Sequence, residues 1–452
     1  MIFRSKRVVL ADKVAPASVH VAQGRIARVD AWGAVPEGAA VTDFGDDVLM
    51  AGVVDTHVHV NEPGRTEWEG FETATRAAAA GGVTTLVDMP LNSIPATTSV
   101  RALDEKRAAA EGKCFVNVAF SGGVVPGNTG ELRAMVDAGV VAFKSFLCES
   151  GVPEFAHVGE ADLRRAMPIL ADTGTTLLVH AELPPALDDA AKRVLGLSPE
   201  AARRYASYLA SRPRAAEDAA LELLFGLAKD TGGKTHVVHL SSADALATLR
   251  RARESGVPLH AETCPHYLTF AAEEIPDGAT EYKCAPPIRE RENRERLWDA
   301  LREGLLDQVV TDHSPSTPAL KCADTGDFLA AWGGISSLEL GLSIVWTGAS
   351  ARGLGLRDVA RLVCEAPARL VGLAARKGHL VPGADADFVV WDPEGERVIE
   401  PSRLHHRHKP TPYAKRTLRG VVKKTYLGGV LVAEDGEVTG GASGALVSRR
   451  HG

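Results

Sequence analysis

The chain has 452 residues, of which 24% are charged, and a formal net charge of −7 at pH 7. Its length suffices for one large domain and a smaller one. The acidic balance argues against nucleic acid as the main partner, and no apolar run is long enough to span a membrane. The six cysteines include no C-x-x-C pair, which indicates free thiols in a reducing compartment. Because no apolar segment of secretory length follows the N-terminus, we expect a cytoplasmic protein.

Short strands separated by turns are predicted near the N-terminus. The apolar stretches that support them are residues 7–10, 18–21 and 25–29. A turn at Gly24 precedes the third stretch.

Two histidines, His57 and His59, follow an apolar run at residues 48–54 and precede a break at Pro63-Gly64. Alternate residues of a strand point to the same face, so the two imidazoles would lie side by side. That arrangement suits one divalent metal ion. Two surface histidines on a loop are the alternative, which the apolar run and the Pro-Gly break disfavour.

Short apolar strands then alternate with helical patterns rich in Ala and Leu. Besides the strand that ends at His57, strands are predicted at residues 84–88, 115–119, 140–144, 176–180, 235–239, 258–262 and 307–312. Helices are predicted at residues 69–80, 101–111, 160–171, 214–230 and 243–254. Eight strands that alternate with helices are typical of a (β/α)₈ TIM-like barrel, an α/β fold. We expect this barrel to occupy residues 52–375.

Strand patterns return in the last part of the chain, at residues 388–391, 421–426 and 430–432. Gly428 and Gly429 separate the last two strands and predict a hairpin turn. We expect residues 1–51 and 376–452 to pair into one small β-sandwich domain beside the barrel. The glycine-rich segment 440–444 predicts a mobile tail.

Polar side chains able to bind metal end several of the predicted barrel strands. They are His57, His59, Lys144, His180, His239 and Asp312. Because barrel active sites lie at the carboxyl ends of the strands, we expect these side chains to converge on one rim. Taken singly, either His180 or His239 would fit a hydrogen-bonded core histidine, and Asp312 would fit a helix N-cap. Taken together, the residues predict a metal site.

Lys144 needs a separate explanation, because an ammonium group beside divalent cations is repelled and desolvated. Burial lowers the pKa of a lysine, and a neutral amine can capture carbon dioxide as a carbamate. The carbamate is an oxygen ligand able to bridge two metals. A lysine paired with a carboxylate at the rim is the alternative that the sequence leaves open.

The chain resembles the amidohydrolase superfamily, specifically its cyclic-amide branch of dihydroorotases, hydantoinases or dihydropyrimidinases, and allantoinases. It is most similar to the allantoinases. The segments that support this resemblance are residues 55–71, 81–93, 142–147, 179–182, 238–242, 262–268, 283–289, 311–314, 331–335 and 383–387. They cover nearly the whole predicted barrel.

The resemblance implies a two-metal hydrolase. His57, His59 and Asp312 would hold the buried metal, His180 and His239 the more exposed one, and N6-carboxylated Lys144 would bridge both. Zinc is the metal most expected, with cobalt, nickel or manganese as alternatives. A hydroxide between the metals would attack the ring amide of allantoin to give allantoate in purine degradation. Asp312 would move the proton to the leaving nitrogen.

Other roles also follow from the resemblance. Substrate contacts would come from Asn92 and from main-chain groups near Ala285 and Ser314, although Asn92 would equally fit a turn residue. A homotetramer is expected. Glu62 and Arg65 would form a rim salt bridge or belong to a gating loop. Two other histidines, His266 and His313, would support the ligands, and His405, His406 and His408 would be structural.

Three kinds of alternative remain: an enzyme of a neighbouring branch, an assembly protein and an enzyme with one metal. Dihydroorotases usually carry Arg where this chain has Asn61, and hydantoinases commonly carry a Tyr that residues 145–150 lack. Both departures favour the allantoinases over those branches. Some relatives have lost metal ligands and act as assembly proteins, but all six ligand positions are filled here. An enzyme with one metal and an unmodified Lys144 is the third alternative.

Overall fold

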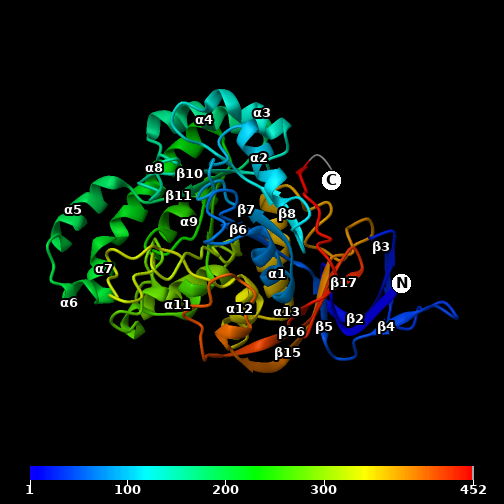
Figure 1. Cartoon of the computed structure of the whole chain (residues 1–452). Helices are drawn as coiled ribbons and strands as arrows, with labels where there is room; N and C mark the ends of the chain where they lie inside the picture. The colour runs from blue at the N-terminus through cyan, green and yellow to red at the C-terminus, as the bar shows by residue number, and fades with distance from the viewer. Residues whose placement is uncertain (450–452) are drawn as a thin grey trace.

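Parallel strands and helices alternate through the middle of the chain in the computed structural model, which describes residues 1–449 (Figure 1). The barrel strands are β6 (Val53–Val58), β7 (Val83–Asp88), β8 (Asn117–Phe120), β9 (Gly122–Gly123), β10 (Phe143–Phe146), β11 (Leu177–His180), β12 (Thr235–Val237), β13 (Leu259–Thr263) and β14 (Gln308–Val309). Their neighbours pair in parallel, in the orders β6-β7-β8 and β14-β13-β12-β11-β10-β9. The predicted barrel is therefore confirmed.

Main-chain hydrogen bonds join the two groups of strands into a ring. At one seam Val58 pairs with His313, and the His59 N–H donates to the His313 carbonyl at 2.8 Å. At the other seam the Val141 N–H donates to the Phe120 carbonyl at 3.0 Å. Because the strands run in parallel, their carboxyl ends lie at one rim.

Helices surround the barrel strands (Figure 1). They are α1 (Phe71–Ala80), α2 (Val100–Ala110), α3 (Leu132–Asp137), α4 (Glu160–Thr173), α5 (Pro184–Val194), α6 (Pro199–Ala202), α7 (Tyr205–Ser211), α8 (Arg214–Thr231), α9 (Leu246–Glu254), α10 (Pro265–Thr269), α11 (Arg291–Arg302), α12 (Gly341–Ser350), α13 (Leu356–Ala360) and α14 (Ala366–Leu370). None of the helices within residues 1–449 is both long and apolar enough to cross a membrane. The predicted helix at residues 69–80 begins two residues later, because Glu69 is buried and accepts a hydrogen bond from the Arg407 N–H at 3.2 Å.

The two ends of the chain form one mixed sheet beside the barrel (Figure 1). Its strands are β1 (Ile2–Val9), β2 (Val14–Ala22), β3 (Arg25–Ala31), β4 (Val41–Asp43), β5 (Val48–Ala51), β15 (Phe388–Val398), β16 (Thr417–Leu427), β17 (Val430–Glu434) and β18 (Glu437–Val438). The antiparallel pairing of β5 with β15 joins the two ends. Gly428 and Gly429 have φ values of 57° and 79° and connect β16 to β17, which confirms the predicted hairpin.

Two barrel strands end earlier than the sequence predicts, and β10 ends two residues later. Lys144 is the second residue of β10 rather than its last, while His239 and Asp312 lie beyond the ends of β12 and β14. The backbone of His239 has a φ of 42° and that of Asp312 a φ of 47°. These left-handed conformations are uncommon for residues other than glycine. They turn the chain out of the parallel ladder at the rim and so shorten the strands.

Within the segment 440–444 that the sequence predicts to be mobile, Gly444 is held by a main-chain hydrogen bond, and the residues after it continue along the barrel. The Gly444 N–H donates to the Cys114 carbonyl at 2.9 Å, and the Val118 N–H donates to the Ala445 carbonyl at 3.0 Å. The Val447 N–H in turn donates to the Val118 carbonyl at 2.9 Å. The tail therefore lies against β8 and satisfies main-chain groups of that strand.

Candidate metal centre

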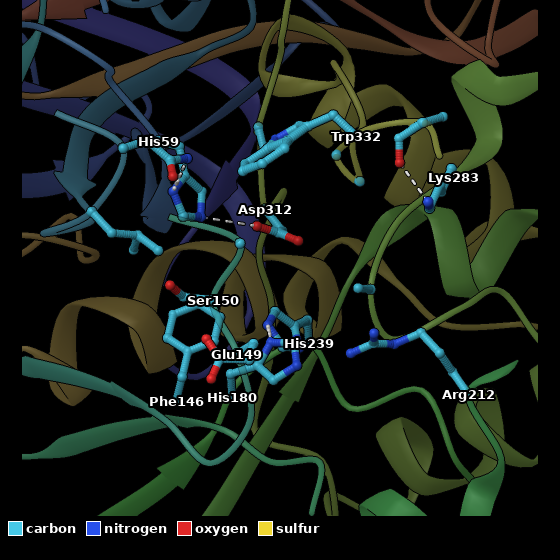
Figure 2. Close-up of a pocket in the computed structure, with 18 of the residues that line it drawn as sticks. His59, Phe146, Glu149, Ser150, His180, Arg212, His239, Lys283, Asp312 and Trp332 are labelled. Carbon is cyan, nitrogen blue, oxygen red and sulfur yellow. Dashed lines mark hydrogen bonds and ion pairs between the residues drawn. The ribbon is translucent and has the colours of Figure 1, made fainter. Parts of the chain in front are cut away.

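A cavity of about 320 Å³ opens at the carboxyl-end rim of the barrel (Figure 2). All six predicted metal ligands line it: His57, His59, Lys144, His180, His239 and Asp312. The structure therefore brings together side chains that are separated by up to 255 positions, between residues 57 and 312.

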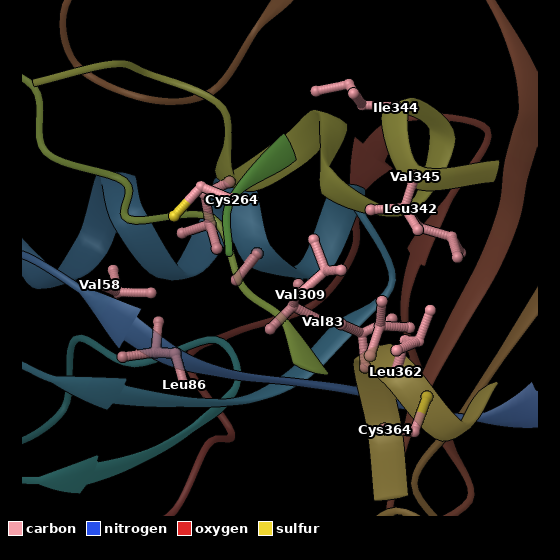
Figure 3. Close-up of a cluster of buried hydrophobic side chains, with 14 of the residues drawn as sticks. Val58, Val83, Leu86, Cys264, Val309, Leu342, Ile344, Val345, Leu362 and Cys364 are labelled. Atoms are coloured by element: carbon pink, nitrogen blue, oxygen red, sulfur yellow. The ribbon is translucent and has the colours of Figure 1, made fainter. Parts of the chain in front are cut away.

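The strands beneath this cavity are fixed by a dense apolar core (Figure 3). Val58 and Leu86 on β6 and β7 are fully buried, and Val309 on β14 is 3% exposed. Replacing a residue such as Leu86 with Ala would cost about 2–5 kcal/mol of folding free energy. A rigid apolar core beneath the cavity holds the side chains at the rim in fixed positions.

The first group of predicted ligands contains His57, His59 and Asp312. The Nε2 atoms of His57 and His59 lie 3.3 and 3.4 Å from Oδ1 of Asp312. The His57 Nδ1–H donates to Glu262 at 2.8 Å, which leaves Nε2 as the nitrogen that faces Asp312.

The second group contains His180 and His239. Nδ1 of His180 lies 3.2 Å from Nε2 of His239. The opposite nitrogen of His180, Nε2, donates to Glu182 at 2.7 Å, so Nδ1 of the neutral ring presents its lone pair to His239. Ligand atoms about 2.1 Å from one tetrahedral zinc ion lie about 3.4 Å apart, close to the separations in both groups.

Burial keeps the imidazoles neutral. It lowers the pKa of His59 to about 4 and lowers the pKa values of His180 and His239. For Asp312, burial opposes ionisation, but His57 and His59 outweigh it and hold the pKa of the carboxyl well below its usual value. Neutral imidazoles beside an ionised carboxylate are the protonation states that bind divalent cations.

Lys144 is fully buried, and its Nζ atom makes no hydrogen bond to any residue in the described part of the chain. Burial lowers the pKa of Lys144 to about 8. The amine lies 4.9 Å from the centre of the Phe146 ring. A buried amine without a partner costs about 1–3 kcal/mol. Such an amine fits a lysine that becomes carboxylated and binds metal. The alternative, a lysine paired with a carboxylate at the rim, is not supported, because Nζ has no hydrogen-bond partner among the described residues.

Two buried glutamates orient the histidines, and neither was among the residues predicted from the sequence. Glu262 accepts hydrogen bonds from His57 and from His236 Nε2, the latter at 3.0 Å. Burial opposes ionisation of Glu262, but these hydrogen bonds outweigh it and lower the pKa to about 2. Glu182 does the same for His180. Each is an acidic residue at or just beyond the carboxyl end of an apolar strand, which is the signal that would have identified it.

The predicted substrate contacts Asn92, Ala285 and Ser314 all line the cavity. Nδ2 of Asn92 lies 3.5 Å from Nδ1 of His59. Asn92 has a φ of 71°, which also fits its alternative role as a turn residue. Arg212, Lys283 and Trp332 also line the cavity, and none of them was predicted from the sequence.

The other polar residues considered from the sequence lie around the site. Arg65 pairs with Glu154 and Glu62 with Lys113, so both form salt bridges. His313 lies 3.3 Å from Glu69. His266 is buried beside Cys264 and Asp312. In the C-terminal segment, His405 pairs with Glu339, His406 is buried near His313, and His408 donates to the Glu67 carbonyl.

The closed barrel and the His-rich rim define an α/β-barrel protein with a candidate metal centre. The model of the Amidohydrolase family matches residues 48–432. Over 450 residues the chain is 52% identical to an allantoinase from Streptomyces avermitilis, covering 99% of this chain and 98% of the relative. It is 50% identical to a mitochondrial allantoinase from Aquarana catesbeiana, covering 84% of this chain and 77% of that relative.

Solved structures give the same result for the fold. An L-hydantoinase (dihydropyrimidinase) from Arthrobacter aurescens superposes with a TM-score of 0.93 at 32% identity, over 99% of both chains. A dihydropyrimidinase from Brevibacillus agri gives a TM-score of 0.89 at 28% identity, over 99% of this chain and 98% of that one. The chain therefore belongs to the amidohydrolase family and, within it, to the allantoinases.

Proposed function

We propose that this protein hydrolyses the ring amide of allantoin to give allantoate. The geometric observation that supports a hydrolase most directly is the pair of facing ligand atoms, His180 Nδ1 and His239 Nε2, 3.2 Å apart on the cavity wall. The substrate comes from the relatives, which are named allantoinases at 52% and 50% identity.

Two divalent ions fit the residues of the cavity. His57, His59 and Asp312 would hold one ion, His180 and His239 the other, and carboxylated Lys144 would bridge them. When bound, such ions polarise the scissile carbonyl and lower the pKa of water. Zinc is the first expectation, with cobalt, nickel or manganese as alternatives, because sites rich in histidine accept all four.

Asp312 performs the proton transfer in this proposal. Its carboxylate is ionised because its pKa is held well below the usual value. It accepts a proton from the attacking water and delivers it to the leaving ring nitrogen, so that water adds across the C–N bond. Asn92 and the main-chain groups of Ala285 and Ser314 orient the ring, since all three residues line the cavity.

The first experiment is steady-state hydrolysis of racemic allantoin by protein of measured metal content. Hydantoin, dihydrouracil and dihydroorotate are assayed alongside. Rapid formation of allantoate with two metals per chain supports the proposal. Preference for hydantoin or dihydrouracil would instead assign the chain to hydantoinase chemistry, and no turnover by fully metallated protein would favour the assembly-protein alternative.

The proposal also covers the domain bounds, the oligomeric state and the cellular location of the protein. We place a barrel at residues 52–375 between the two halves of a β domain, 1–51 and 376–452, and the membership of the strands in the two kinds of sheet supports this division. We expect a homotetramer in the cytoplasm. Sedimentation velocity and cell fractionation test these two points, and a monomer or an organellar protein would contradict them.

A further inference from the structure

Arg212 is a cationic residue on the cavity wall for which the proposed mechanism has no use. It follows α7, and its side chain is 22% exposed. Its guanidinium end is directed into the cavity toward His239 (Figure 2). A guanidinium with access to a cavity of this size is available to a bound ligand.

Glu182 fixes the orientation of this guanidinium. The Nε–H of Arg212 donates to Oε1 of Glu182 at 3.1 Å, and the Nη2 group donates to Oε2. Nη2 also lies 3.9 Å from the sulfur of Cys148. Glu182 is fully buried and accepts the hydrogen bond from His180 as well, so the carboxylate has a single position. The side chain of Arg212 is therefore held before any ligand arrives.

The remaining nitrogen, Nη1, makes no hydrogen bond to any residue between 1 and 449. A guanidinium has five N–H donors, and two of them belong to this nitrogen. Neighbouring polar groups are already used. The hydroxyls of Ser150 and Ser211 each donate to a main-chain carbonyl at 2.6 Å, and Lys283 donates to two main-chain carbonyls. Nη1 of Arg212 is thus a donor on this wall with both of its N–H groups free for a ligand.

The position of Arg212 relative to the metal ligands determines which part of a ligand it can reach. Glu182 bonds to Nε2 of His180, the nitrogen on the opposite side of the ring from Nδ1, which faces His239. Arg212 therefore lies outside the ring of predicted ligands. Arg212 and Asp312 line the same cavity, so a ring bound beside Asp312 shares that cavity with the guanidinium.

Resting on the function proposed above, we propose that Nη1 of Arg212 donates hydrogen bonds to the carbonyl oxygen of the ureido substituent of the substrate. Arg212 then selects hydantoins whose ring substituent carries a hydrogen-bond acceptor. An apolar substituent would cover the guanidinium without replacing its hydrogen bonds to water, which is unfavourable. Sites built to bond a polar group discriminate strongly against analogues that lack it.

Two substitutions test this role. Arg212→Gln removes the charge and most donors, and Arg212→Lys keeps the charge but replaces the fixed planar group with a single ammonium. We measure KM and kcat for allantoin, and Ki for unsubstituted hydantoin as a competitive inhibitor, which is measurable whether or not hydantoin is hydrolysed. Metal content is determined in every preparation. Arg214→Gln is the matched control, because Arg214 pairs with Glu290 and does not line the cavity.

The expected result is a rise in KM for allantoin of about 10- to 100-fold, the size of one hydrogen bond to a charged group. The Ki of hydantoin stays within about threefold, because hydantoin has no ureido group to lose. Metal content stays at the wild-type level, and Arg214→Gln behaves as wild type. If Arg212→Gln does not fold, Arg212→Lys alone decides, with the same pattern expected.

Two outcomes overturn the inference while the proposed function stands. In one, KM for allantoin is unchanged. In the other, KM for allantoin and Ki for hydantoin rise together, or metal is lost, which would make Arg212 a positioning residue that acts only through Glu182 and His180. If the wild-type protein does not hydrolyse allantoin, the proposed function fails, and this inference fails with it.

Discussion

Glu262 accepts a hydrogen bond from Nδ1 of His57 at 2.8 Å in the interior of the barrel, where both side chains are 1% exposed. This contact fixes the tautomer of His57 so that Nε2 is the nitrogen available to a metal. A carboxylate behind a histidine ligand also makes the imidazole a stronger base. The orientation of one predicted ligand therefore depends on a residue more than 200 positions away, as the separation of 205 residues shows.

The substitution Glu262→Gln tests this dependence. We expect metal affinity to fall about 10- to 100-fold, because a neutral amide holds the His57 Nδ1–H less strongly than a carboxylate does. Calorimetric titration of the metal-free protein with metal measures the change in affinity. The exposed Glu303→Gln is the control, since Glu303 lies on the surface and pairs with Arg250. Wild-type affinity in Glu262→Gln would show that the hydrogen bond does not tune the ligand.

The substitution Lys144→Met separates function from folding. Activity should be lost, because the residue that bridges the two predicted metals is gone; short carboxylic acids should restore part of it only in Lys144→Ala, where the shortened side chain leaves room for them. The metal-free variant should nevertheless be more stable than metal-free wild type by about 1–3 kcal/mol, because a buried amine without a partner is removed. Chemical denaturation of both metal-free proteins at pH 7 measures this gain.

The gain should depend on pH in a defined direction. Burial lowers the pKa of Lys144 to about 8 in the folded protein, from 10.5 as the ordinary value. Between pH 8 and pH 10.5 the unfolded chain binds more protons than the folded protein, so the free energy of unfolding of metal-free wild type rises with pH. The advantage of Lys144→Met should be largest below pH 8 and should shrink toward pH 10.5. A constant advantage across this range would contradict the lowered pKa.

The rate at which the metal site is reconstituted should follow the fraction of Lys144 that is a neutral amine. At a fixed concentration of dissolved carbon dioxide, the rate should rise about tenfold from pH 6 to 7 and level off above a pH of about 8. His59, with a pKa of about 4, is already neutral in this range and does not contribute. Recovery of activity after zinc and bicarbonate are added to metal-free protein gives the rate. A rate that is independent of carbon dioxide would contradict carboxylation.

Strand ends were predictable because an apolar run followed by a polar residue marks them, and barrels place such residues at one rim. This is why the sequence identifies His57 and His180 as residues that meet at the rim. Arg212 follows a short helix, and no periodic pattern in the sequence relates it to Glu182. Its position depends on the tertiary packing of α7, which composition and spacing do not encode.

At Gly444 the composition predicts a mobile segment, but tertiary contacts hold the residue in place. Glycine-rich composition is typical of mobile segments. Here the absence of a side chain at Gly444 lets the backbone approach β8, since a Cβ atom at this position would lie 2.0 Å from the Val116 carbonyl oxygen. The same composition thus produces a docking segment where a neighbouring strand has free main-chain groups.

The substitution Gly444→Ala should therefore destabilise the protein, because the added methyl group cannot be accommodated without moving the tail from β8. Loss of the three main-chain hydrogen bonds of the tail would cost about 1–3 kcal/mol after the entropy that the released segment regains. Gly441→Ala is the matched control, since a Cβ atom there meets no atom within 4 Å. Thermal unfolding should show a lower Tm for Gly444→Ala alone, with unchanged turnover at 25 °C because the tail does not line the cavity. Equal Tm values for the two variants would mean that the contacts of the tail with β8 add nothing to stability. A loss of turnover at an unchanged Tm would instead show that the tail affects the site.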